Sequence, residues 1–142
     1  AKACSKIQGQ VTSAPCSIAQ VAAGAAVSED PSIADAMKAA FLSRRDLMID
    51  GLSAIPGLKV NRPMGAFYLF PDVSALFGKS IGNRTIATAE DFAMYLLEEA
   101  HVATVGGGAF GTPECIRLSY AASETQLNEA LARISKAVTA LQ

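Results

Sequence analysis

The stretch that decides the fold is Gly106–Tyr120, "GGGAFGTPECIRLSY", in which a run of glycines is followed by an apolar segment. Residues 106–111 match the dinucleotide-binding pattern G-x-G-x-x-G. That pattern needs a strand before it and a helix after it, because the pyrophosphate lies on the helix N-terminus. Here a proline and β-prone residues follow. The stretch therefore predicts a glycine loop between two strands, and no nucleotide site.

Arg117 lies inside the strand that this stretch predicts. Side chains alternate along a strand, so Arg117 shares one face with Cys115 and Ser119, while Ile116 and Leu118 point to the other face. Two interpretations remain open on this pattern alone. One is a solvent-facing arginine on a one-sided sheet. The other is a carboxylate receptor, because a planar, permanently charged guanidinium binds carboxylate bidentately.

The segments around this strand predict a mixture of helices and strands. Capping residues mark three helix starts: Asp30 with Pro31, Thr88 with Asp91, and Ser123 with Gln126. Apolar residues at helical spacing predict helices at 17–27, from 31 to about 55, from 88 to about 100, and from 123 to 141. Strands are expected at 57–63, 65–71, 102–105 and 115–121, with a polar loop through Asn83.

These elements predict an α/β fold, specifically a two-layer sandwich of the α+β kind. A three- to four-stranded sheet is covered by helices mainly on one face, and a connecting helical segment precedes it. The chain has 142 residues, about the length of one domain. We expect residues 1–27 to be a connecting segment, since they are too rich in alanine to form a core. Residues 28–142 are expected to be the domain.

Composition and charge exclude several classes of function. The net charge is −1, which argues against binding of nucleic acid or an anionic membrane through bulk electrostatics. No apolar run approaches the roughly 18 residues of a membrane span. Three widely spaced cysteines predict reduced thiols in a cytoplasmic setting rather than a disulfide framework or zinc site. His101 is the single histidine, so the sequence predicts no catalytic triad and no metal site.

Three segments resemble, in order and spacing, the C-terminal part of the fold-type I, pyridoxal-phosphate-dependent aminotransferases. They are "RRDLMIDGLSAIPGLKVNRPMGAFYLFPDVS" (44–74), "EDFAMYLLEEAHVATVGGGAFG" (90–111) and "CIRLSYA" (115–121). The likeness is to the class-I branch, in particular the bacterial aspartate aminotransferases. Upstream, "QGQVTSAPCSIAQVAA" (8–23) resembles the segment that joins the large domain of this family to its small domain.

The resemblance implies roles for individual residues. Arg117 is similar to the arginine that binds the substrate's α-carboxylate, and Phe110 to a residue beside the substrate pocket. Ser13 resembles a position that approaches the cofactor phosphate of the neighbouring subunit in the dimer. The loop departs from the usual "PGSAFG" at Gly106 and Gly108, where proline and serine are typical. Both departures are expected to loosen the loop.

The resemblance also implies what lies outside this chain. The cofactor would be pyridoxal 5′-phosphate, the partners a large domain and the second subunit of a homodimer, and the substrates an amino acid and a 2-oxo acid. Ser5-Lys6 begins like the family's cofactor-lysine motif, but the residues that should follow are missing. The chain alone, expected to be a fragment, is therefore predicted to be inactive, with no catalytic residue of its own. The alternative is an autonomous small-molecule-binding or interaction domain without catalysis.

Overall fold

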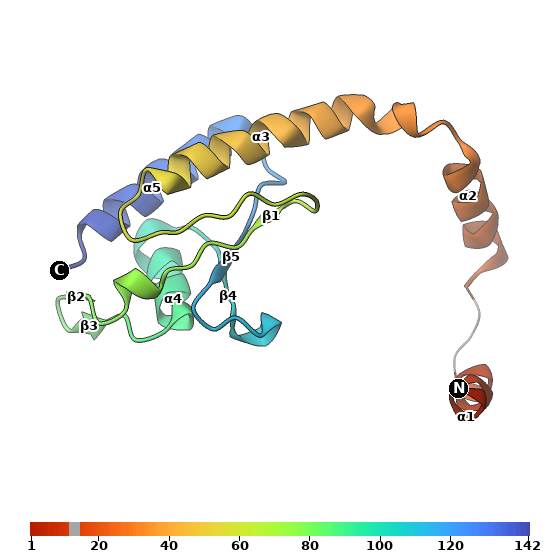
Figure 1. The fold of residues 1–142 in the computed structure, drawn as a ribbon, viewed down its shortest axis with the longest axis horizontal. Helices are drawn as coiled ribbons and strands as arrows, with labels where there is room; N and C mark the ends of the chain where they lie inside the picture. Colours follow the sequence, from red (N-terminus) through yellow and green to blue (C-terminus); the bar gives the residue numbers. More distant parts are fainter. Residues whose placement is uncertain (12–14) are drawn as a thin grey trace. The chain divides into compact units, whose positions relative to one another are not determined.

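The computed structural model describes residues 1–11 and 15–142, and Figure 1 shows the order of the elements along the chain. The chain divides into two compact units, residues 1–36 and residues 37–142, which we call the N-terminal and the C-terminal unit. The boundary that the sequence predicts, after Val27, stays a prediction.

The N-terminal unit consists of short helices. These are α1 (Lys2–Val11), α2 (Ser17–Ser28) and the 3₁₀ helix η1 (Pro31–Ala34). The helix predicted at 17–27 is confirmed by α2. The cap predicted at Asp30 is also present, because its Oδ1 accepts a hydrogen bond of 3.0 Å from the Ser32 N–H. Every described residue of this unit is exposed, so its apolar side chains contribute no core.

Three helices and two small antiparallel sheets make up the rest of the fold. The helices are α3 (Asp35–Ser53), α4 (Ala89–Ala100) and α5 (Glu124–Thr139), with 3₁₀ turns η2 (Ser74–Leu76) and η3 (Gly108–Phe110). One sheet has the order β1 (Tyr68–Leu69), β5 (Ile116–Ser119), β4 (Val105–Gly106), and the other pairs β2 (Ser80–Ile81) with β3 (Arg84–Thr85). The α/β fold class and the three-stranded sheet are as the sequence predicts.

The core lies between the helices and one face of the three-stranded sheet. Ile116 and Leu118 of β5 are buried in the same cluster as the inward faces of the helices, whereas Arg117 is half-buried and Ser119 exposed. Helices α3 and α5 lie side by side (Figure 1), and Gly51 fits directly against the Leu131 side chain. The alternation predicted for β5 therefore sets which of its side chains remain outside the core.

Both capping boxes predicted for this unit are present. At the start of α4, the Thr88 hydroxyl accepts from the Asp91 N–H and the Asp91 carboxylate accepts from the Thr88 N–H. Ser123 and Gln126 make the same reciprocal pair at the start of α5. Helix α4 ends at His101, which adopts the left-handed conformation with φ of 55°. These helix ends are thus fixed by local hydrogen bonds.

The strand predictions need correction in two places. Residues 57–63 are not a strand: their one ladder contact is an isolated bridge between Lys59 and Asp72. The segment predicted as a polar loop through Asn83 instead contains η2 and the start of the β2–β3 hairpin. That hairpin turns at Gly82-Asn83, where Gly82 has φ of 57°, a value that glycine adopts without steric cost.

Two surveys of the described residues are negative. Within residues 1–11 and 15–142, no helix combines the length and apolarity needed to cross a bilayer. In the same residues, no group of three His, Cys, Asp or Glu side chains is placed to hold a metal ion.

Candidate functional site

Arg117 is held between two aromatic rings on the open face of the three-stranded sheet. Its guanidinium carbon lies 4.6 Å from the centre of the Tyr68 ring and 4.5 Å from the centre of the Phe110 ring. Each contact is within the range of a cation–π interaction, which contributes roughly 0.5–2 kcal/mol depending on solvent exposure. The two rings therefore restrict the guanidinium to a narrow range of orientations.

The pairing of the strands explains why these side chains meet. Tyr68 pairs with Ser119, two positions along from Arg117, so the side chains of Tyr68 and Arg117 are diagonal neighbours on one sheet face. Phe110 comes from η3, in the loop between β4 and β5. Its ring meets Phe70 edge-on, with centres 6.1 Å apart and planes at 88°. Phe110 is thus supported from the β1 side while it covers Arg117.

The guanidinium of Arg117 has no carboxylate partner in the described part of the chain. The ion pairs there involve Arg45, Arg62, Arg84, Arg133 and Lys59. A half-buried cation without a counter-ion retains its N–H donors for a ligand. A guanidinium offers its N–H donors as a planar fork, which matches the geometry of a carboxylate.

The glycine loop is shaped by a close backbone approach at Gly107. A Cβ there would collide with the Thr112 carbonyl oxygen and lie 2.6 Å from the Cys115 carbonyl oxygen, so no larger residue fits. The Gly107 N–H donates to the Cys115 carbonyl at 2.7 Å, and the Phe110 N–H donates to the Gly107 carbonyl at 2.9 Å. The loop that carries Phe110 is therefore fastened to the start of β5.

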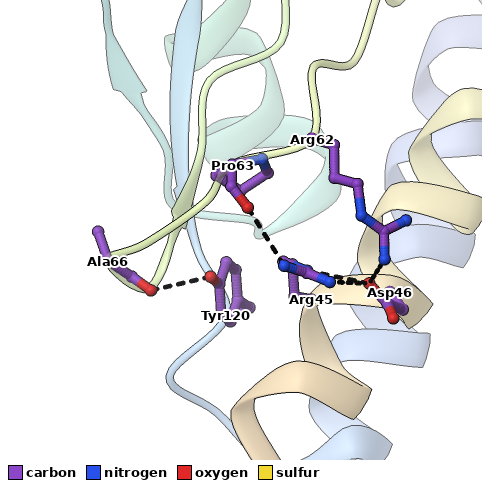
Figure 2. A network of polar contacts seen from close by, with 6 residues as sticks. All are labelled: Arg45, Asp46, Arg62, Pro63, Ala66 and Tyr120. Atoms are coloured by element: carbon purple, nitrogen blue, oxygen red, sulfur yellow. Dashed lines mark hydrogen bonds and ion pairs between the residues drawn. The ribbon is translucent and has the colours of Figure 1, made fainter. Parts of the chain in front are cut away.

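The segment before β1 is fastened to the end of β5 by Tyr120, which is buried. Its hydroxyl donates to the Ala66 carbonyl at 2.9 Å (Figure 2), and its backbone N–H donates to the Phe67 carbonyl at 2.9 Å. Ala66 has φ of 60°, which is unusual for a residue with a side chain. Two hydrogen bonds from one residue thus hold the backbone next to Tyr68 in a strained form.

An ion-pair network on α3 supports the same segment (Figure 2). The Asp46 carboxylate pairs with Arg45 at 2.9 Å and with Arg62 at 3.0 Å. Arg45 also donates to the Pro63 carbonyl at 3.3 Å. The loop that leads into β1 is consequently tied both to a helix and to the central strand.

The structure describes two of the three predicted site residues. Arg117 and Phe110 are brought into contact, whereas Ser13 lies outside the described residues. Cys115, which the sequence predicts on the same face as Arg117, directly precedes β5 and is buried. Burial is the main cause that raises the pKa of this thiol, and the nearby charges of Glu114 and Asp72 raise it further. The thiol therefore stays protonated at neutral pH.

The sequence interpretation missed Tyr68 as a site residue. None of Phe67, Tyr68 and Phe70, the aromatic residues of the strand predicted at 65–71, is buried. Tyr68 and Phe70 are two positions apart and therefore point to the same face of a strand. This spacing is visible in the sequence. An aromatic pair at that spacing, on a strand facing an arginine, favours a cation–π site once the strands are paired.

Comparison with known proteins identifies the family of this chain. The sequence model for "Aminotransferase class I and II" matches residues 1–134. This chain belongs to the class I and II aminotransferases. It is 45% identical to an aspartate aminotransferase of Rhizobium meliloti (strain 1021) over 96% of the chain. It is also 46% identical, over 94% of the chain, to an aspartate/prephenate aminotransferase of Cereibacter sphaeroides.

A solved structure of a similar aminotransferase matches nearly the whole chain. The crystal structure of the aspartate aminotransferase from Rhizobium meliloti has a TM-score of 0.89 and 44% identity, over 99% of this chain and 36% of that one. The chain spans about a third of the length of the curated aminotransferases that it matches, 33% and 34% of the two relatives above.

Proposed function

We propose that this chain is the substrate-carboxylate-binding part of a pyridoxal-phosphate-dependent, aspartate-type aminotransferase, and that Arg117 binds the α-carboxylate. The intact enzyme would transfer an amino group from an amino acid to a 2-oxo acid. The observation that carries the proposal is the Arg117 guanidinium, flanked by Tyr68 and Phe110 and free of any carboxylate partner in the described residues. Relatives named aspartate aminotransferase support the reaction class.

The two rings give Arg117 a positional role. With Tyr68 and Phe110 packed against the guanidinium, we expect a carboxylate to bind at its edge through two parallel hydrogen bonds in the guanidinium plane. Such a fixed carboxylate leaves its α-carbon in one orientation, and orientation of this kind lowers the barrier of a subsequent step. The contribution that we propose for this chain is therefore binding and alignment of the substrate.

The described residues do not form a pyridoxal phosphate site by themselves. A lysine that binds the cofactor covalently needs a pocket that lowers its pKa, and none of the lysines in the described residues is buried. The cofactor, where bound, acts as the electron sink of the reaction. We place the cofactor site in the rest of the polypeptide and in a second subunit of a homodimer, and the enzyme in the cytoplasm.

Substitution of Arg117 by lysine in the polypeptide that contains this chain tests the proposal. Lysine keeps the positive charge but offers no planar fork, so we expect kcat/KM to fall by about 10–100-fold, mostly through KM. Steady-state kinetics with an amino-acid donor measure this. The matched control is Arg44→Lys, because Arg44 is also half-buried and stacked on an aromatic ring, that of Phe41 at 5.4 Å.

The outcomes separate clearly. An unchanged kcat/KM in Arg117→Lys, or an equal loss in Arg44→Lys, would contradict the assignment of the carboxylate to Arg117. A wild-type protein that transfers no amino group from any amino acid would contradict the reaction class and favour a binding domain without catalysis.

A further inference from the structure

Glu90, in the first turn of α4, reaches across to the glycine loop between β4 and β5. Its Oε1 accepts a hydrogen bond of 3.2 Å from the backbone N–H of Gly108, the first residue of η3. The two residues are 18 positions apart, so this contact joins separate elements. Within the described residues, it is the one hydrogen bond in which a side chain accepts from a backbone N–H of residues 106–111.

The carboxylate of Glu90 occupies space that two glycines leave open. A Cβ added at Gly106 would lie 2.6 Å from the Glu90 Oε1, and a Cβ added at Gly108 would lie 2.7 Å from the same atom. Either substitution would displace the carboxylate from the loop. Glu90 and the two glycines therefore fit one another as a set, at the two positions where the sequence departs from the usual proline and serine.

Gly108, whose N–H donates to Glu90, lies two positions before Phe110, the residue that packs on the Arg117 guanidinium. Gly108 opens the turn that carries Phe110, and the Phe110 ring lies 4.5 Å from the guanidinium carbon of Arg117. The Phe110 side chain is 48% exposed, so the surrounding side chains enclose it only in part. The position of its backbone, which Glu90 helps to fix, is therefore important for its contact with Arg117.

We propose that Glu90 is a positioning residue that fastens the 106–111 loop to α4 and so keeps Phe110 on the Arg117 guanidinium. This role rests on the proposed function, because it concerns the alignment of the carboxylate-binding arginine. In this chain a carboxylate-to-backbone hydrogen bond supplies the rigidity that glycines at positions 106 and 108 would otherwise remove.

The test compares Glu90→Ala with Glu90→Gln and Glu99→Ala in the intact polypeptide. Alanine removes the acceptor, so KM for the amino donor should rise about three- to tenfold while kcat changes less. Glutamine keeps an acceptor oxygen and should restore most of the affinity. Glu99→Ala is the control, because Glu99 is an exposed glutamate on the same helix and its carboxylate makes no hydrogen bond within the described residues.

A second measurement follows the loop itself. Hydrogen exchange of the amides in residues 106–112 should speed up in Glu90→Ala and stay near the wild-type rate in Glu90→Gln and Glu99→Ala. Gly108→Ala should reproduce the rise in KM by displacing the carboxylate. The double variant Glu90→Ala/Gly108→Ala should then be no worse than either single variant, because both changes remove one interaction.

Three results would overturn the inference while leaving the proposed function intact. They are an unchanged KM in an active Glu90→Ala enzyme, unchanged exchange in the loop, or additive losses in the double variant. A wild-type protein without aminotransferase activity would instead overturn the proposed function, and this role of Glu90 would fall with it.

Discussion

The N-terminal and C-terminal units are both rich in apolar residues, yet one of them builds a core and the other does not. Helix α2 is apolar around most of its circumference and buries none of its twelve residues. Helix α5 carries charges on one side and buries Leu127, Ile134, Ala137 and Val138 on the other. The comparison shows that a one-sided apolar stripe, rather than apolar content, marks the helices that stabilise this fold.

The largest expected difference between the units comes from removing a buried ring. Phe92 of α4 is 0% exposed, so Phe92→Ala should lower the free energy of unfolding by about 3–5 kcal/mol through lost burial and the cavity left behind. Ile18 of α2 is 79% exposed, and Ile18→Ala in the same chain should change that free energy by less than about 0.5 kcal/mol. Urea unfolding followed by circular dichroism measures both. Equal losses of unfolding free energy in the two variants would contradict the difference between the units.

Two glycines, one from each unit, test whether the units also differ in how closely atoms pack around the backbone. Gly107→Ala forces a Cβ against two carbonyl oxygens and should destabilise the C-terminal unit by about 1–3 kcal/mol. Gly24→Ala meets no atom within 4 Å, and alanine favours a helix interior by about 0.5–1 kcal/mol, so it should raise the helicity of α2. Thermal unfolding with a helicity signal distinguishes them. A neutral Gly107→Ala would contradict the close approach seen in the loop.

The smallest expected effect is on the pH dependence of the free energy of unfolding. Each unit contains an aspartate whose pKa is lowered by hydrogen bonds from a serine two positions later. The pKa of Asp72 is lowered by hydrogen bonds from the hydroxyl and backbone N–H of Ser74, and that of Asp30 by hydrogen bonds from the backbone N–H and hydroxyl of Ser32. A lowered folded-state pKa gives stability that is present above the unfolded value, about 3.9, and is lost as the pH falls through the folded value.

Asp72→Asn should therefore make the acid side of the stability profile shallower below about pH 4. Asp30→Asn should leave that profile unchanged, because the N-terminal unit contributes no core to the unfolding transition. Urea unfolding at a series of pH values from about 2 to about 7, a range that spans the ordinary aspartate pKa, measures this profile. A steeper acid limb in Asp72→Asn would reverse the sign argued here.

Helix ends were predictable from the sequence because their determinants are local. The caps at Asp30, Thr88 and Ser123 each use residues within three positions, so a short stretch of sequence contains the whole interaction. The stripe along α5 is local in the same sense, since a helix repeats its contacts every turn.

Strand pairing was harder because it depends on residues far apart in the sequence. Residues 57–63 have strand-like composition, but Lys59 finds only Asp72 as a partner and no ladder forms. The β2–β3 hairpin was missed although Gly82-Asn83 is a two-residue turn signal between short strand-like segments. That signal outweighs the polar composition that favoured a loop.

The site divides in the same way. Alternation placed Arg117 off the core face, and the role that we propose for it came from the family resemblance. Tyr68 contacts Arg117 because β1 pairs with β5, and Glu90 contacts the glycine loop because α4 approaches it. These contacts join residues 49 and 18 positions apart respectively. No local pattern in the sequence contains such contacts.

The burial of Cys115 has a practical consequence for chemical labelling. Cys4 and Cys16 are exposed, whereas Cys115 is buried with a raised pKa. Because thiol reagents attack the accessible thiolate, a maleimide dye on the native chain would mark the first sixteen residues and leave the sheet untouched. The third thiol becomes a natural reporter, reacting only when the strand that carries Arg117 leaves its place.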